Sequence, residues 1–103
     1  KQRIIVNSRN INLLDALQDS AIIKSFESEE VELAIDYYED GFIDLLTTRL
    51  EGFTREKAAN LKGSGLVFYL YNVKSKKSIK TAAEFEPDGV ITDNIAMTKS
   101  HFD

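Results

Sequence analysis

The sequence predicts a parallel α/β domain made of five β/α units. Apolar runs rich in β-branched and aromatic residues recur along the chain, and a helical pattern follows each of them. The runs show little polar-apolar alternation, which is typical of parallel strands that are covered on both faces. Strands that alternate with helices imply crossover connections and a parallel sheet. We expect the strands at residues 4–6, 21–26, 42–47, 66–73 and 89–92.

The helix between the second and third strands has the clearest pattern. Ser28 is its expected N-cap, and two glutamates follow near the positive end of the helix dipole. Val31, Ala34, Ile35 and Tyr38 then form one apolar face. Four other helices are expected. The first lies around Leu13, Leu14 and Leu17, and the second runs from the cap Thr54 to the stops Gly63 and Gly65. The third runs from the cap Ser75 to Pro87, and the fourth covers residues 95–102 after the cap Asn94.

Two strand entries look alike. Residues 87–94 read Pro-Asp-Gly-Val-Ile-Thr-Asp-Asn, and residues 39–46 read Glu-Asp-Gly-Phe-Ile-Asp-Leu-Leu. Both place Asp-Gly before an apolar run, so we expect Asp40 and Asp88 to hold equivalent positions. This supports a repeated β/α architecture.

Composition limits the class of protein. The 103 residues carry 43% hydrophobic and 29% charged residues, which suits one small globular domain, residues 1–103. The net charge of -4 argues against general nucleic-acid binding, and no apolar run is long enough to insert this segment into a membrane. The absence of cysteine excludes disulfides and thiolate metal sites. Because the first residue is Lys1, we expect a piece of a longer protein, either cytoplasmic or a soluble domain of an envelope-associated protein.

A five-stranded sheet raises a packing problem. Five strands cannot close an eight-unit barrel, so helices on one side only would leave the other face of the sheet exposed. Three solutions are open: helices on both faces, a second copy of the chain, or a missing N-terminal part of a barrel.

Candidate ligand residues follow from the topology. In parallel β/α folds, ligands bind where the strands end and the loops converge. Arg49 and Lys74 could hold a phosphate or a carboxylate there. Asp44 and Asp93 are metal ligands, an acid pair or caps of the turns that follow the strands. The full set expected to bind a ligand is Arg49, Tyr69, Tyr71, Asn72, Lys74, Asp93 and Asn94.

Three segments resemble the glycerophosphodiester phosphodiesterases, a family of TIM-barrel enzymes related to the phosphatidylinositol-specific phospholipases C. Residues 87–94 are similar to the final-strand Asp-Gly-Ile-Ile-Thr-Asp motif of that family. Residues 69–72 stand where the family has Trp-Thr-Val-Asn, and residues 22–26 resemble its fifth strand, which ends in Ser-Phe. The resemblance spans roughly residues 21–94 and implies the C-terminal part of a (β/α)8 barrel.

The resemblance also shows what differs from the family. Its fourth strand carries a metal-binding Glu and a Lys, where this chain has Asn7 and Arg9 in the nearest register, and an amide replaces a carboxylate poorly on a hard cation. The only histidine is His101, so one chain cannot supply the catalytic histidine pair of the family. We therefore expect no catalytic residue, metal ligand or cofactor in this chain.

Three functional hypotheses remain. The first is a degenerate, non-catalytic domain of a larger protein that serves oligomeric assembly or binds a phosphodiester or sugar-phosphate group. The second is a C-terminal fragment of an active phosphodiesterase of lipid metabolism, whose upstream part would supply the catalytic residues and bind Ca²⁺ or Mg²⁺. The third is a doubly wound domain of receiver or flavodoxin type. The expected partners are a second copy of the chain or the missing N-terminal half.

Overall fold

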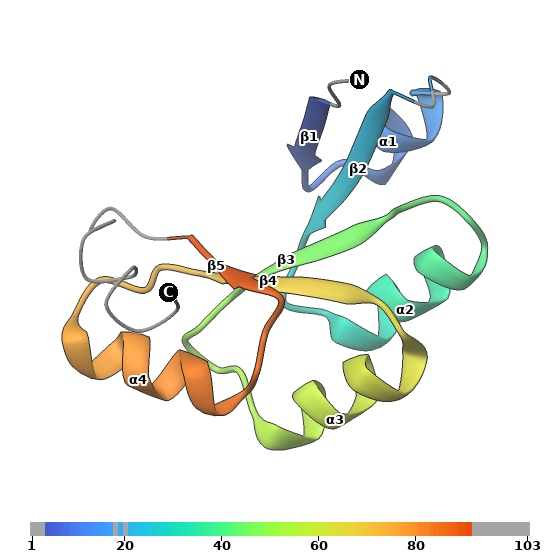
Figure 1. Ribbon diagram of the computed structural model, residues 1–103. Helices are drawn as coiled ribbons and strands as arrows, with labels where there is room; N and C mark the ends of the chain where they lie inside the picture. Colours follow the sequence, from blue (N-terminus) through green and yellow to red (C-terminus); the bar gives the residue numbers. More distant parts are fainter. Residues whose placement is uncertain (1–3, 18, 20, 92–103) are drawn as a thin grey trace.

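The computed structural model describes residues 4–17, 19 and 21–91 of the chain. Within these residues, five parallel strands alternate with four helices, which confirms the predicted β/α alternation for this part of the chain (Figure 1). The strands are β1 (Ile4–Ser8), β2 (Ile22–Glu27), β3 (Leu45–Arg49), β4 (Val67–Tyr71) and β5 (Gly89–Val90). The helices are α1 (Ile11–Ala16), α2 (Val31–Glu39), α3 (Arg55–Ser64) and α4 (Lys76–Glu84).

The strand order in the sheet is β1-β2-β3-β4-β5, and every neighbouring pair is parallel. When strands follow one another in order, right-handed crossovers place every connecting helix on the same face of the sheet. A doubly wound fold would instead reverse the strand order and use both faces. The order therefore selects the barrel-like arrangement and excludes the receiver or flavodoxin type.

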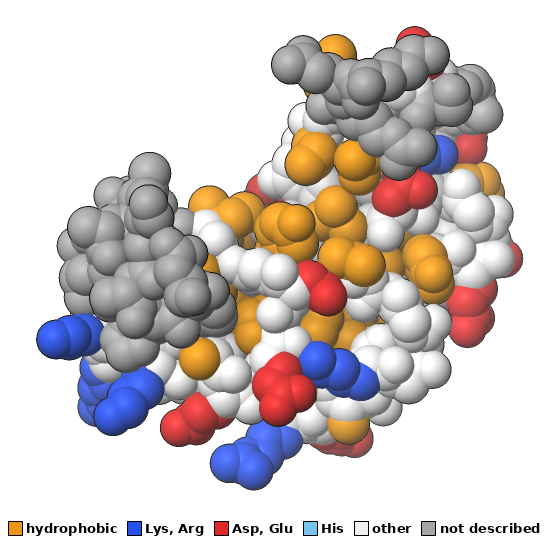
Figure 2. Space-filling model, in the orientation of Figure 1, with side chains coloured by type: hydrophobic (Ala, Val, Ile, Leu, Met, Phe, Trp, Pro, Cys, Tyr) orange, Lys and Arg blue, Asp and Glu red, His pale blue; other side chains and the backbone are white. Residues whose placement is uncertain are grey.

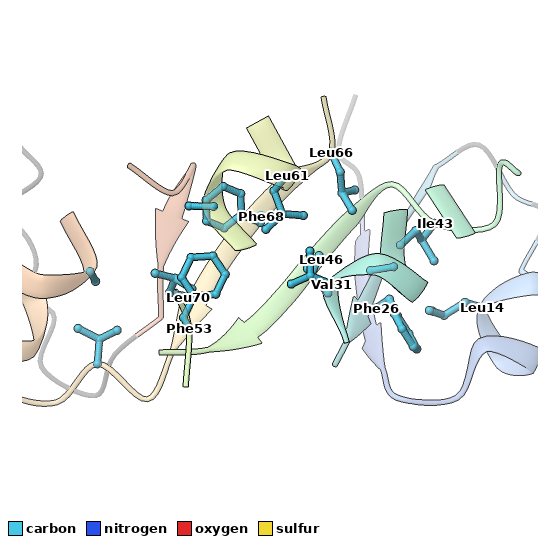
Figure 3. Close-up of a cluster of buried hydrophobic side chains, with 14 of the residues drawn as sticks. Leu14, Phe26, Val31, Ile43, Leu46, Phe53, Leu61, Leu66, Phe68 and Leu70 are labelled. Carbon is cyan, nitrogen blue, oxygen red and sulfur yellow. The ribbon is translucent and has the colours of Figure 1, made fainter. Parts of the chain in front are cut away.

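The core lies between the helices and one face of the sheet (Figure 3). Phe26, Leu46 and Phe68 come from three successive strands, and each is at most 5% exposed. Residues of all four helices belong to the same apolar cluster: Leu14, Val31, Ala34, Ala58, Leu61, Ile79 and Ala82. Because one cluster contains residues from each of these four helices, none of the helices within residues 4–91 covers the opposite face.

Most helix boundaries follow their local signals. Thr54 and Ser75 cap α3 and α4, and Ser75 forms a capping box with Ser78. Gly65 ends α3 with a φ of 82°, in the left-handed region where glycine has no steric penalty. The prediction that Ser28 is the N-cap of α2 is wrong. The cap is Glu30, and Ser28 Oγ accepts a hydrogen bond from the Glu30 backbone N–H in the preceding turn. The expected helix over residues 95–102 and its cap Asn94 lie outside the described residues.

The third strand begins at Leu45, later than predicted. The two similar segments that lead into β3 and β5, residues 39–46 and 87–94, therefore align differently in the structure than in the sequence. Asp44 N–H donates to the Lys24 carbonyl at 2.8 Å, while Asp44 Oδ2 accepts from Lys24 N–H at 2.8 Å. Asp88 makes the same pair of bonds with Phe68, at 2.9 and 3.0 Å. The structural equivalent of Asp88 is therefore Asp44, and the prediction of Asp40 is wrong. Each aspartate fastens the start of its strand to the preceding strand.

The opposite face of the sheet is open. Side chains alternate between the faces of a strand, so the residues next to those of the core line this second face. Leu45 is buried there but lies outside the main core cluster, whereas Ile5 is 54% and Val67 38% exposed. Figure 2 shows hydrophobic side chains gathered over the strands in the hollow of the molecule. The sheet is thus covered by helices on one side and carries apolar side chains at its surface on the other.

Candidate functional site

Polar side chains gather at the carboxyl end of the open face, which we call the mouth. The side chains of the mouth are Asn7, Arg9, Ser25, Glu27, Glu29, Thr47 and Tyr71, from β1 to β4 and the loops that follow β1 and β2. The register sets Asn7 beside Ser25 and Glu27 beside Thr47, so the polar residues of adjacent strands meet. This is the edge at which parallel β/α folds bind ligands.

The inner part of the mouth is a chain of hydrogen bonds. Ser25 Oγ donates to Asn7 Oδ1 at 2.8 Å and lies 2.8 Å from Thr47 Oγ1. Since the hydroxyl hydrogen of Ser25 goes to Asn7, Thr47 is the donor to Ser25. Asn7 Nδ2 in turn donates to Glu27 Oε1 at 2.8 Å. Ser25 and Thr47 are buried, so these bonds compensate the cost of placing hydroxyl groups away from water.

The outer part of the mouth centres on Arg9. Arg9 Nε donates to Glu27 Oε2 at 3.2 Å, and Nη2 donates to Glu29 Oε2 at 3.1 Å. Nη2 also donates to Tyr71 Oη at 3.1 Å, and the Tyr71 hydroxyl donates to Glu29 at 3.4 Å. Tyr71 belongs to β4 and Arg9 directly follows β1, so one guanidinium links the end of β1 with β4 across the two strands between them.

These contacts change the ionisation of both partners. The hydrogen bond from Arg9 and its positive charge lower the pKa of the Glu29 carboxyl. The hydrogen bond to Glu29 and its negative charge raise the pKa of the Arg9 guanidinium. Both groups are therefore charged at neutral pH. The two side chains are 54% and 45% exposed, so solvent screens the pair and its effect on stability is small.

The pH dependence follows from the lowered pKa of Glu29. A carboxyl with a folded pKa below its unfolded value of 4.5 stabilises the fold above that pH. This contribution is lost as the pH falls through the lower, folded pKa. We expect the Tyr71 ring signals in NMR to stay constant above about pH 5 and to shift on acidification below about pH 4.5. The same titration of Glu29→Gln should lack that shift, and an unchanged shift would contradict the assignment.

The predicted ligand residues fall into three places. Tyr71 lies in the mouth, and Tyr69 is next to it on the same face, where its ring packs against Gly89. Arg49 and Asn72 lie beside the mouth, and both contact Glu51. Arg49 Nε is 3.9 Å from Glu51 Oε1, and Asn72 Nδ2 donates a hydrogen bond to the same oxygen at 2.6 Å. Lys74 is exposed before α4. Asp93 and Asn94 lie outside the described residues.

The sequence analysis expected Asp44 to be a metal ligand or the cap of a turn after a strand. Asp44 instead caps the start of β3 through its two hydrogen bonds to Lys24. It sits where β3 begins, whereas the mouth lies where the strands end. The sequence analysis did not identify Glu29 as part of a site, because it assigned that residue to the helix dipole. The available signal was the spacing of polar residues at positions 7 and 9 and at positions 25, 27 and 29, because side chains two residues apart lie on one face of an extended chain.

A groove of about 470 Å³ opens on the helical side, next to Glu29. Its walls are the amino-terminal parts of α2 and α3, including Val31 and Thr54. Lys57 of α3 is also part of the wall, and its Nζ donates to the Glu29 carbonyl at 3.4 Å and to the Gly52 carbonyl at 3.3 Å. Lys57 therefore anchors the backbone that carries Glu29 into the mouth.

Among the described residues, no three His, Cys, Asp or Glu side chains are arranged to hold a metal ion. Within the same part of the chain, every helix is too short or too polar to span a membrane.

Solved structures share this architecture. A glycerophosphoryl diester phosphodiesterase from Silicibacter pomeroyi superposes with a TM-score of 0.80 at 21% identity, over 93% of this chain and 36% of that one. A second such enzyme, from Agrobacterium tumefaciens, superposes with a TM-score of 0.76 at 15% identity, over 92% of this chain and 43% of that one. An Oleispira antarctica phosphodiesterase, in complex with the product sn-glycerol-3-phosphate, superposes with a TM-score of 0.77 at 13% identity, over 98% of this chain and 42% of that one.

No family model and no curated protein matches the sequence. The structural likeness, at identities of 21% and below, concerns the fold. The chain also spans less than half the length of each of these three structures. The described part of the chain, five parallel strands in sequential order with four helices on one face, therefore has the fold of part of a TIM barrel, as found in these phosphodiesterase structures.

Proposed function

We propose that this chain is a non-catalytic phosphodiesterase-like domain of a larger assembly, which it joins through the open face of its sheet. The observation that carries the proposal is the apolar surface of that face, with Ile5 54%, Val67 38% and Ile91 48% exposed. Exposed apolar groups on one face of a sheet gain free energy when a partner covers them, by about 25 cal/mol per Å² of apolar surface buried.

The free edge of β1 supports the same proposal. Among the described residues, β1 pairs only with β2, so the outer side of a five-residue strand offers unpaired backbone groups. Ile4, on the helical side of this edge strand, is 63% exposed. An apolar edge strand with unpaired N–H and C=O groups is a site for pairing with another strand. A partner that supplies further β/α units covers the face and the edge together.

The solution mass of the 103-residue chain tests this function. We expect light scattering after size exclusion to give a dimer or larger species, and Ile5→Lys with Val67→Lys to reduce the mass to that of a monomer, because two charges would then stand on the apolar face. Leu13→Lys is the matched control, since Leu13 is 47% exposed on α1, away from that face. A soluble monomer before any substitution would contradict the proposal.

A second candidate function is the binding of a phosphodiester or sugar-phosphate group at the mouth. Its support is the Arg9 guanidinium, whose Nη1 group makes no hydrogen bond to any residue in the described ranges and so keeps two donors for a ligand. One of the similar structures holds sn-glycerol-3-phosphate. We expect sn-glycerol-3-phosphate to shift the NMR signals of Arg9 and Tyr71 in the unaltered chain. In Arg9→Ala, we expect the compound to leave the Tyr71 signals unshifted.

The alternative is that this chain belongs to an active enzyme. This alternative is favoured because the chain covers only part of each similar phosphodiesterase structure. The rest of the full-length protein would then supply the catalytic residues and a Ca²⁺ or Mg²⁺ site for phosphodiester hydrolysis. Hydrolysis of a glycerophosphodiester by the full-length protein, lost on removal of divalent cations, would establish this alternative.

A further inference from the structure

The exposed side of α4 carries positive charges that its own chain does not neutralise. Lys76, Lys77 and Lys80 belong to this helix, Lys74 precedes it, and all four side chains are exposed. No ion pair joins any of them to a residue in the described ranges. Lys76 and Lys77 lie in the first turn, where the helix dipole disfavours a cation. Figure 2 shows positive side chains gathered over α4 at the lower left. The local structure of α4 thus gives no reason for these charges.

A groove of opposite charge lies between α2 and α3. The groove of about 470 Å³ at their amino-terminal ends continues into a second hollow of about 410 Å³, because Glu32 and Asn60 line both. Lys57 of the wall donates its ammonium hydrogens to two backbone carbonyls. Within the described residues, Glu29 alone of the acidic wall residues forms an ion pair. These acidic residues are Glu29, Glu30, Glu32, Asp36 and Glu56.

The charges of the helix and of the groove have the same spacing. Lys76 and Lys80 are four residues apart on α4, and Glu32 and Asp36 are four residues apart on α2. Each pair therefore lies on one side of its helix, about 6 Å apart along the axis. All four side chains are exposed. If α4 lay along the groove, a row of lysines would face a row of carboxylates.

One chain cannot make this contact with itself. The strand order is sequential and the four described helices lie on one face, so α3 lies between α2 and α4, as Figure 1 shows. The groove is thus on one side of α3 and α4 is on the other. A contact between two different surfaces of identical chains is heterologous, and it can continue from copy to copy.

We propose that a second copy of this chain docks its helix α4 in the acidic groove between α2 and α3. The contact is electrostatic and solvent-exposed, so salt screens it and a single contact is weak. It is distinct from the proposed association through the open face, which is apolar and lies on the other side of the sheet. Copies that are already joined through their open faces would present several such helices and grooves at once, and these contacts would strengthen one another.

The test is a concentration series of NMR spectra, with Ile5→Lys and Val67→Lys in every chain to disrupt the open face. At an ionic strength of about 0.01 M, where charges act over about 30 Å, we expect the α4 and groove signals to shift together as the concentration rises to about 1 mM. At about 0.15 M, the screening distance falls to about 8 Å, and we expect association to weaken at least about tenfold. Shifts in β1 and β4 would report association through the open face instead, so the two proposals are tested separately.

Reversal of the charges gives the decisive comparison. Glu32→Lys with Asp36→Lys makes the groove basic, and Lys76→Glu with Lys80→Glu makes α4 acidic. Copies of either variant then present like charges to one another, so neither variant alone should show the concentration-dependent shifts. An equimolar mixture of the two variants brings opposite charges together again and should recover the shifts.

Glu39→Lys with Asp40→Lys is the matched control. It changes the net charge by the same amount at the carboxyl end of α2, outside the groove, and should leave the association unchanged. If circular dichroism shows that the basic-groove variant does not fold, Glu32→Gln with Asp36→Asn removes the same charges and should also weaken association. The absence of α4 and groove shifts at low salt would overturn the proposal. Equal weakening in the control, or a mixture that recovers no shift, would overturn it as well.

Discussion

Phe68→Ala is expected to lower the free energy of unfolding by about 3–5 kcal/mol. Phe68, the second residue of β4, is 1% exposed, and its ring stacks on Phe53 at a centroid distance of 5.5 Å. Phe53 also meets Phe85 edge to face at 5.0 Å, so one truncation removes a wall from a cluster of three rings. The loss combines the transfer free energy of the ring with the cavity left behind.

The measurement for Phe68 is chemical denaturation followed by circular dichroism. A domain of this size has a total stability of about 5–15 kcal/mol, so Phe68→Ala is expected to be largely unfolded if the chain lies at the low end of that range. Val67→Ala is the neighbouring control, because Val67 lies on the open face and is 38% exposed. We expect it to cost less than about 1 kcal/mol. Equal losses at the two positions would contradict the assignment of the two faces.

Asp44→Ala is expected to lower the free energy of unfolding by about 1.5–3 kcal/mol, the range for hydrogen bonds to charged groups. The carboxylate accepts from Lys24 N–H at 2.8 Å, at the point where β3 meets β2. Alanine leaves that N–H without its partner, whereas asparagine keeps an oxygen acceptor at the same place. Asp44→Asn should therefore retain most of the stability.

Asp88 provides an internal comparison for Asp44. It caps β5 with the same pair of bonds to Phe68, so Asp88→Ala should show a loss of the same order. Asp36→Ala, on the exposed side of α2, should change stability by less than about 0.5 kcal/mol. If the losses at Asp44 and Asp36 are equal, the strand-capping role is wrong.

The local sequence determined the elements and their order. Apolar runs placed all five strands, and Thr54, Ser75 and Gly65 act as helix boundaries through contacts within a few residues of the chain. Such signals are readable because their partners are close in sequence. Ser28 was misplaced because its hydroxyl stabilises the turn before α2, an alternative that serine offers as readily as a cap.

The tertiary structure alone decided which residues meet at the mouth and which face stays open. Arg9 and Tyr71 are separated by most of the chain, and only the order and register of four strands bring them within 3.1 Å. Strand order likewise decided that the four described helices cover one face, since helical periodicity marks an apolar side but not the surface it will contact. Elements follow from neighbours in sequence, whereas the site and the open face follow from strand pairing across long separations, which no local pattern encodes.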